Sequence, residues 1–175
     1  GDARPDVTLI HRNFLTFPGQ LEREARLHPD LESLLRQLKR QLEHPEVAFG
    51  AQGPALHRPL FFEPYHNMEP PLATGLVPAG LLHRWDPQAP LPEDAQPRFW
   101  EQVYRALTPQ DLADPQTRRY LFWQHTLQGQ QYVLRQAPRA ALQEFERALA
   151  LGPNSPEVLQ MVREVKERWP EGQLR

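Results

Sequence analysis

The spacing of hydrophobic positions changes along the chain, and its first part mixes strand and helix. Residues 7–11 form a short β-prone run, and leucines then recur at helical spacing over residues 19–43. Charged residues opposite those leucines indicate a solvated helix face. Pro29 should divide this region into two helices, because the residue before a proline disfavours the α conformation.

Two further strand candidates lie in the proline-rich middle of the chain, at residues 59–63 and 80–85. With the first run they predict a three-strand sheet, mixed or parallel, since a helical connection follows the first strand. Residues 87–97 have the composition of an extended, semi-rigid linker. We therefore predict a small α/β subdomain over residues 1–96.

From residue 97 to residue 175 the pattern is helical throughout, which predicts an all-α subdomain. Three helices should begin with proline at the first helical position, at Pro109, Pro115 and Pro138. Thr108 and Asp114 are the expected N-cap residues of the first two. Gly152-Pro153 should end the helix that Pro138 begins. Residues 155–169 form the last predicted helix, with one apolar face.

Residues 122–155 match the spacing of one 34-residue tetratricopeptide repeat, in which two antiparallel helices pack at close range. With Pro153 as the closing proline, the signature positions fall on Gly129, Tyr132, Ala141, Phe145 and Ala148. His125 and Gln128 depart from the signature, since they stand where Trp and Leu are usual. A single repeat cannot bury its hydrophobic face alone, so we expect the last helix to cap it.

Composition narrows the possible functions. The net charge of −2 offers no basic field, so we expect no nucleic-acid partner. The absence of cysteine excludes a thiol nucleophile, a disulfide framework and Cys-based zinc sites. No apolar run reaches the roughly 18–20 residues that span a bilayer, so this segment should not itself insert into a membrane. The 20 prolines and 18 arginines against 2 lysines suit a GC-rich genome and are compatible with a heat-adapted protein.

The sequence carries no recognisable catalytic or metal-binding pattern. It lacks Gly-x-Ser-x-Gly and a glycine-rich phosphate loop, and it has only two serines, Ser33 and Ser155. His57, His66 and His83 are separated by spacings that fit no helical or hairpin ligand pair, so we expect loop or surface histidines. We therefore predict no catalytic residue, no metal and no cofactor for this chain.

Two groups of residues are candidates for binding. Tyr65, His66 and Asn67 follow a predicted strand, and ligands of open α/β sheets bind at the carboxyl ends of strands. The alternatives for this loop are a packed connection or the site of a small α/β enzyme. The second group, His125, Gln128 and Tyr132, belongs to the repeat, whose groove we expect to contact a partner.

Four landmarks in order carry a family resemblance: Arg4-Pro5-Asp6-Val7, Arg58-Pro59-Leu60-Phe61-Phe62, Val77-Pro78-Ala79-Gly80-Leu81-Leu82-His83-Arg84, and the repeat helices. In these the chain resembles the soluble C-terminal region of a family of polytopic membrane proteins similar to protein O-mannosyltransferases. Ala79 departs from the family pattern, which usually has Glu before the Gly-Leu pair. The catalytic acid of such transferases sits in an early loop between membrane helices, so no catalytic residue is carried over to this chain.

The resemblance implies a non-catalytic, extracytoplasmic domain of a membrane glycosyltransferase-like protein. Its partner would be a protein or glycan acceptor, or the membrane portion of the same polypeptide. The alternative is a free-standing cytoplasmic tetratricopeptide protein that serves as an interaction scaffold. The two differ in what the gene encodes before Gly1, where membrane helices would support the first.

Overall fold

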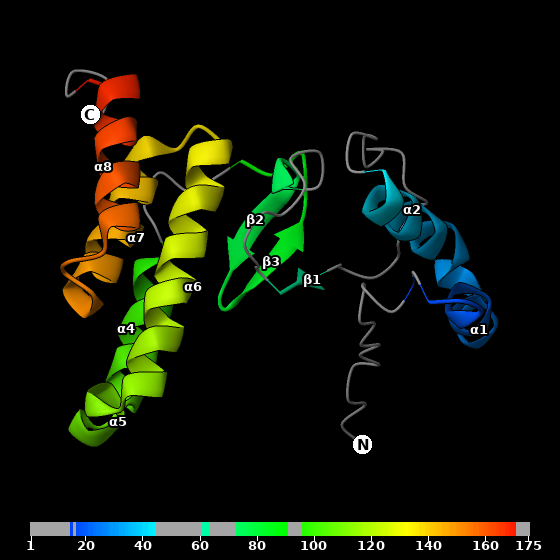
Figure 1. The fold of residues 1–175 in the computed structure, drawn as a ribbon, viewed down its shortest axis with the longest axis horizontal. Coiled ribbons are helices and arrows are strands. Elements are labelled where there is room, and N and C mark those ends of the chain that lie inside the picture. The colour runs from blue at the N-terminus through cyan, green and yellow to red at the C-terminus, as the bar shows by residue number, and fades with distance from the viewer. Residues whose placement is uncertain (1–14, 16, 45–60, 64–72, 91–95, 171–175) are drawn as a thin grey trace. The chain divides into compact units, whose positions relative to one another are not determined.

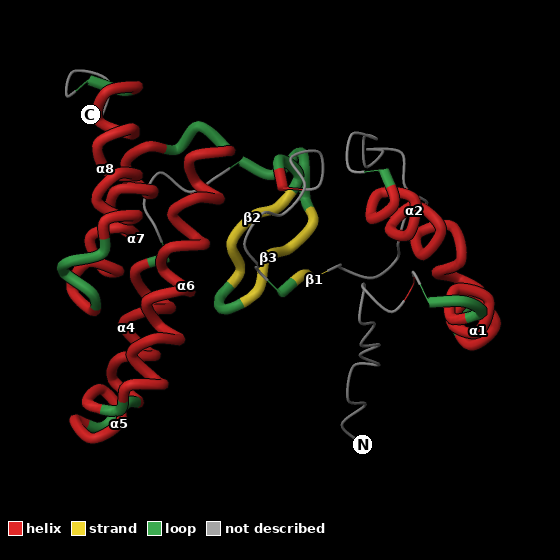
Figure 2. Tube along the Cα trace, in the orientation of Figure 1, coloured by secondary structure: helices red, strands yellow, loops and turns green. Residues whose placement is uncertain are grey.

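The computed structural model describes residues 15, 17–44, 61–63, 73–90 and 96–170. The predicted strand over residues 7–11 lies outside them. The chain divides into two compact units, residues 1–57 and 58–175. The described part is mostly helical, with one small sheet (Figures 1 and 2).

The described helices of the first unit follow the leucine pattern. Helix α1 spans Gln20–Leu27, the 3₁₀ turn η2 spans Pro29–Leu31, and α2 spans Glu32–Glu43. The predicted break at Pro29 is confirmed. The buried side of α2 carries Leu34, Leu35 and Leu38, while Glu32 and Arg36 form an exposed ion pair on its other side. Such an exposed i, i+4 pair contributes only about 0.3–0.5 kcal/mol, so leucine burial dominates.

The sheet of the second unit is antiparallel, so the predicted mixed or parallel sheet is wrong. It contains β1 (Phe61–Phe62), β2 (Leu76–Ala79) and β3 (Leu82–Trp85) in the order β1-β3-β2 (Figure 2). A tight turn with Gly80 at φ 71° joins β2 to β3, which makes the two strands antiparallel. We did not predict β2, because Pro78 interrupts its pattern. Proline is tolerated there because β2 is an edge strand.

The helices after residue 96 agree closely with the prediction. They are α4 (Pro97–Ala106), α5 (Pro109–Ala113), α6 (Pro115–Leu134), α7 (Pro138–Leu151) and α8 (Pro156–Arg168). Each begins with proline, whose fixed φ and missing N–H suit the first helical position. Thr108, Asp114 and Ser155 accept hydrogen bonds from the backbone of the first turns of α5, α6 and α8. Thr108 and Asp111 form a complete capping box.

Helices α6, α7 and α8 share one core (Figure 1). Tyr132, Ala141, Phe145 and Ala148 are fully buried in it, and α8 contributes Val158 and Val165. Gly129 lies directly against the Phe145 ring, where any β-carbon would overlap it. The positions that the sequence selected for close helix packing therefore lie in the interior of this helix group.

The hairpin is bound to α6 by three side chains at helical spacing. Gln128 donates a hydrogen bond to the backbone carbonyl of Gly80. Gln131 donates to the carbonyls of Ala73 and Leu76. Arg135 donates to the carbonyls of Thr74 and Ala89. Gln96, at the end of the predicted linker, accepts a 2.8 Å bond from the Gly80 N–H. The hairpin thus belongs with the helices in residues 58–175, whereas the sequence placed it in a subdomain ending at residue 96.

Candidate functional site

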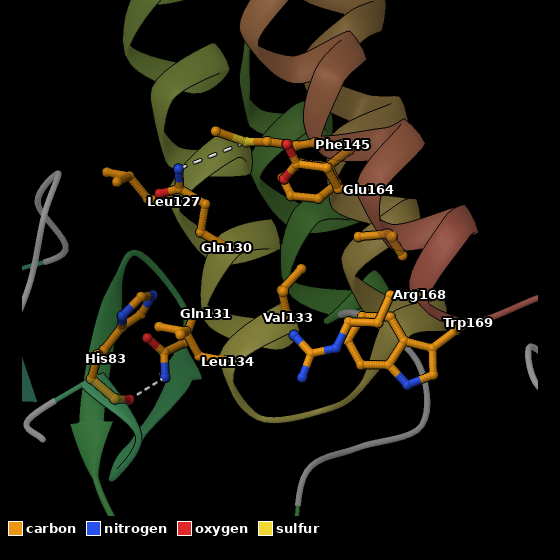
Figure 3. A pocket seen from close by; sticks show the side chains of 13 residues that line it. His83, Leu127, Gln130, Gln131, Val133, Leu134, Phe145, Glu164, Arg168 and Trp169 are labelled. Carbon is orange, nitrogen blue, oxygen red and sulfur yellow. Dashed lines mark hydrogen bonds between the residues drawn. The ribbon is translucent and has the colours of Figure 1, made fainter. Parts of the chain in front are cut away.

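A pocket of about 470 Å³ lies between α6 and α8, and the hairpin contributes Ala73 and His83 to its lining (Figure 3). We call it the α6–α8 pocket. Ligand pockets of proteins typically measure roughly 300–1,000 Å³. Its apolar lining comes from three helices: Leu127, Val133, Leu134, Phe145, Met161 and Val165.

Polar groups surround this apolar lining. Gln130 of α6 contacts the Met161 sulfur at 3.7 Å through its amide nitrogen, which is a weak hydrogen bond. Glu164 and Arg168 project from α8, and both side chains are solvent-exposed. The Arg168 guanidinium lies 4.4 Å from the Trp169 ring centroid, within the range of a cation–π contact. The pocket can therefore hold an apolar side chain while amide and charged groups contact the chain that carries it.

His83 is the unusual polar group of the pocket lining. Its side chain is only 2% exposed, and neither ring nitrogen has a hydrogen-bond partner among the described residues. Burial lowers its pKa to about 4, so the imidazole is neutral at pH 7. The expectation of a loop or surface histidine is wrong for His83, because it faces inward from the central strand β3. His57 and His66 lie outside the described residues.

The six binding residues that the sequence suggested are not gathered at this pocket. Tyr65, His66 and Asn67 lie outside the described residues. His125, Gln128 and Tyr132 are fully buried within the second unit. There Gln128 bonds the hairpin, and burial raises the pKa of the Tyr132 hydroxyl, which favours its protonated form.

His125 belongs to a buried hydrogen-bonded chain across three helices. The Tyr104 hydroxyl of α4 lies 2.7 Å from His125 Nε2, and His125 Nδ1 lies 2.6 Å from Glu144 Oε2 of α7. Arg147 Nη1 donates to the other Glu144 oxygen at 2.6 Å. The Trp100 ring centroid is 4.0 Å from that of His125. Tyr104, His125, Glu144 and Arg147 thus each have a partner, which buried polar groups require.

Tyr104, His125 and Glu144 place a hydroxyl, an imidazole and a carboxylate in the order found in catalytic triads, where they act as nucleophile, base and orienting group. Two observations favour a structural role here. His125 and Glu144 are fully buried and neither lines the α6–α8 pocket, so a molecule bound there does not contact them. Burial, reinforced by the nearby Glu144 charge and opposed by Arg147, raises the pKa of Tyr104, so its hydroxyl is not activated. The chain of hydrogen bonds fixes the packing of α4, α6 and α7.

The sequence did not indicate this chain of hydrogen bonds or the α6–α8 pocket. Tyr104, His125 and Glu144 are 21 and 19 residues apart, so no local spacing connects them. The one available signal was the presence of polar residues, His125 and Gln128, at positions of the predicted repeat that are usually apolar. Polar residues at interior positions require buried partners.

The described residues contain no group of three or more His, Cys, Asp or Glu side chains that could hold a metal ion. Within the same part of the chain, every helix is too short or too polar to cross a membrane. Comparisons with protein-family models, curated proteins and solved structures find no match to this chain, so its function is inferred from the site itself.

Proposed function

We propose that residues 58–175 form a binding module of the tetratricopeptide type that holds a segment of a partner polypeptide in the α6–α8 pocket. The observation that carries the proposal is the pocket itself, a mainly apolar pocket of about 470 Å³ between α6, the first helix of the pair, and α8, the helix that follows the pair. The close packing of Gly129 against Phe145 supports the repeat assignment.

The composition of the pocket favours a polypeptide as the ligand. Protein interfaces combine an apolar centre with a polar rim, and a few buried anchor side chains supply most of the affinity. Leu127 and Met161 provide the apolar centre, and Gln130, Glu164 and Arg168 provide the rim. A short segment with one or two large apolar side chains fits this arrangement.

The family resemblance suggests where such a module works. As the extracytoplasmic domain of a membrane glycosyltransferase-like protein, it would bind an acceptor or partner, or the membrane portion of its own polypeptide. It would perform no transfer itself, so turnover of a lipid-linked sugar donor by this chain alone would contradict the proposal. A cytoplasmic scaffold would use the same pocket, and membrane helices encoded before Gly1 would distinguish the two settings.

Two leucines of similar exposure allow a matched test. Leu134 is 44% exposed and lines the pocket, whereas Leu159 of α8 is 42% exposed and does not line it. Peptides selected from a random library against the whole chain would be measured by isothermal titration against Leu134→Arg and Leu159→Arg. We expect Leu134→Arg to weaken binding by about tenfold or more, because a charged side chain would replace part of the apolar wall, and loss of an important interface contact costs over about 1 kcal/mol. Leu159→Arg should change affinity by less than about twofold.

Three results would overturn the proposal. The first is that no peptide is enriched against the folded protein. The second is that the enriched peptides bind both variants as well as the original chain. The third is that Leu159→Arg weakens binding as much as Leu134→Arg, which would place the contact surface elsewhere on α8. Circular dichroism of both variants checks that they remain folded.

A further inference from the structure

We propose that the α6–α8 pocket selects a tyrosine-like anchor, an aromatic ring with a neutral hydroxyl at its far end, and that His83 forms the hydrogen bond to that hydroxyl. This inference rests on the proposed function and specifies the chemistry of the bound segment. It starts from an imidazole that lies in the pocket wall without a hydrogen-bond partner among the described residues.

The sheet explains why His83 faces the pocket. In β3, Leu82 and Arg84 are exposed while His83 between them is buried, since successive strand residues point to opposite faces. Its cross-strand neighbours are Phe62 and Pro78. His83 is therefore the β3 side chain that lines the pocket (Figure 3).

The Gln131 amide beside His83 is not its hydrogen-bond partner. Gln131 lies beside it in the pocket (Figure 3), but its amide nitrogen already donates to the carbonyls of Ala73 and Leu76. A buried polar group left unpaired costs roughly 1–3 kcal/mol, so most such groups in proteins are paired. Both ring nitrogens are closed to solvent in the structure. A ligand therefore removes this cost only if the ring turns toward the pocket and meets the hydrogen-bonding group of the ligand.

The remaining lining determines what can carry that group. Leu127, Leu134, Met161 and Val165 give the pocket apolar walls, and its volume of about 470 Å³ leaves room for an aromatic side chain. Tyrosine combines a large apolar body with a polar tip, and a buried tyrosine hydroxyl usually finds a partner. A neutral tip matches His83, because the pKa of about 4 keeps the imidazole uncharged at pH 7. A neutral imidazole can accept from a hydroxyl or donate to it.

Two small ligands that differ by one hydroxyl test this inference on the whole chain. N-acetyltyrosinamide and N-acetylphenylalaninamide would each be titrated into isotope-labelled protein and followed by NMR. We expect both to shift resonances of Leu127 and Met161, with tyrosinamide binding about fivefold tighter through the added hydrogen bond. Tyrosinamide alone should shift the imidazole nitrogen resonances of His83.

Substitution of His83 supplies the second arm. His83→Phe should remove the preference for tyrosinamide, while His83→Gln, which keeps a donor and an acceptor, should retain part of it. If a variant fails to fold, the shift of the His83 imidazole resonances in the unsubstituted protein still tests whether the tyrosine hydroxyl binds His83. Equal affinity for the two ligands, or an unchanged His83 signal, would overturn the inference and leave peptide binding intact. If neither the two amides nor the library peptides bind, the proposed peptide-binding function is contradicted as well.

Discussion

At the scale of single residues, Gly129 shows how packing overrides helix propensity. Glycine in a helix interior is less favourable than alanine by roughly 0.5–1 kcal/mol, and Gly129 lies well inside the 20-residue helix α6. The Phe145 ring occupies the space that a β-carbon would need. Phe145 is fully buried, so its ring cannot move aside without disturbing the core.

We therefore expect Gly129→Ala to destabilise the protein, against the usual effect of this substitution. Overpacking a core costs about 1–3 kcal/mol, which exceeds the gain in helix propensity. Chemical denaturation monitored by circular dichroism measures the change. Glu146→Ala on the exposed side of α7 is the control and should stay within about 0.5 kcal/mol of the original chain. A more stable Gly129→Ala protein would mean that Phe145 can relax.

His83 should make the stability of the fold depend on pH. Its pKa is about 4 in the folded protein and near the ordinary 6.5 in the unfolded chain. As the pH falls, the unfolded chain therefore takes up a proton at this histidine before the folded protein does. The stability that the neutral His83 contributes is fully present above about pH 6.5 and is lost by about pH 4. The loss amounts to at most about 3 kcal/mol.

Comparison with His83→Phe isolates this contribution. The free energy of unfolding of the variant should fall less steeply between pH 6.5 and 4 than that of the original chain. Asp111 and Asp114 have lowered pKa values through their hydrogen bonds to Thr108 and Thr117, and they act equally in both proteins. Parallel pH profiles would show that the imidazole is not buried in solution.

At the scale of elements, α6 performs two tasks on different faces. Gly129 and Tyr132 pack toward α7, while Gln128, Gln131 and Arg135 bind the hairpin backbone. The second set explains why a buried helix carries amides at interior positions. Edge strand β2 and the turns around it have carbonyls that the sheet does not pair, and the α6 side chains satisfy them.

Gln131→Met should loosen the hairpin, because it keeps the side-chain volume but leaves the carbonyls of Ala73 and Leu76 without this donor. We expect a loss of about 2 kcal/mol in stability. Gln130→Met is a matched control on the next residue, since Gln130 makes only the weak contact with the Met161 sulfur. Hydrogen exchange should show faster exchange of β2 and β3 amides in the first variant. Equal exchange in both would contradict the role of Gln131.

At the scale of the whole molecule, the division after His57 groups the hairpin with the helices. A fragment of residues 58–175 should therefore unfold in a single cooperative transition. A fragment of residues 97–175, which begins where the sequence placed the boundary, lacks the hairpin that covers Gln128 and Gln131. We expect it to be less stable by several kcal/mol, since it exposes part of the buried face of α6. Equal denaturation midpoints of the two fragments would restore the boundary at residue 96.

The chain by itself determined the features that depend on neighbours in sequence. Thr108 and Asp114 followed by proline fixed two helix starts, because capping involves only residues within one turn. Pro29 set the break between α1 and η2 for the same local reason. The sequence also selected Gly129 and Phe145 as positions of close helix packing, and the two residues contact each other in the structure.

Only the tertiary structure decided the rest. The antiparallel order of the strands depended on β2, whose pattern Pro78 obscures. The burial of His83 and its place in the pocket wall depended on which face of β3 meets α6, and a shift of one residue would have reversed it. The chain from Tyr104 through His125 to Glu144 joins three helices. Hydrogen bonding and burial act through space, so residues distant in sequence acquire their chemistry only when the fold brings them together.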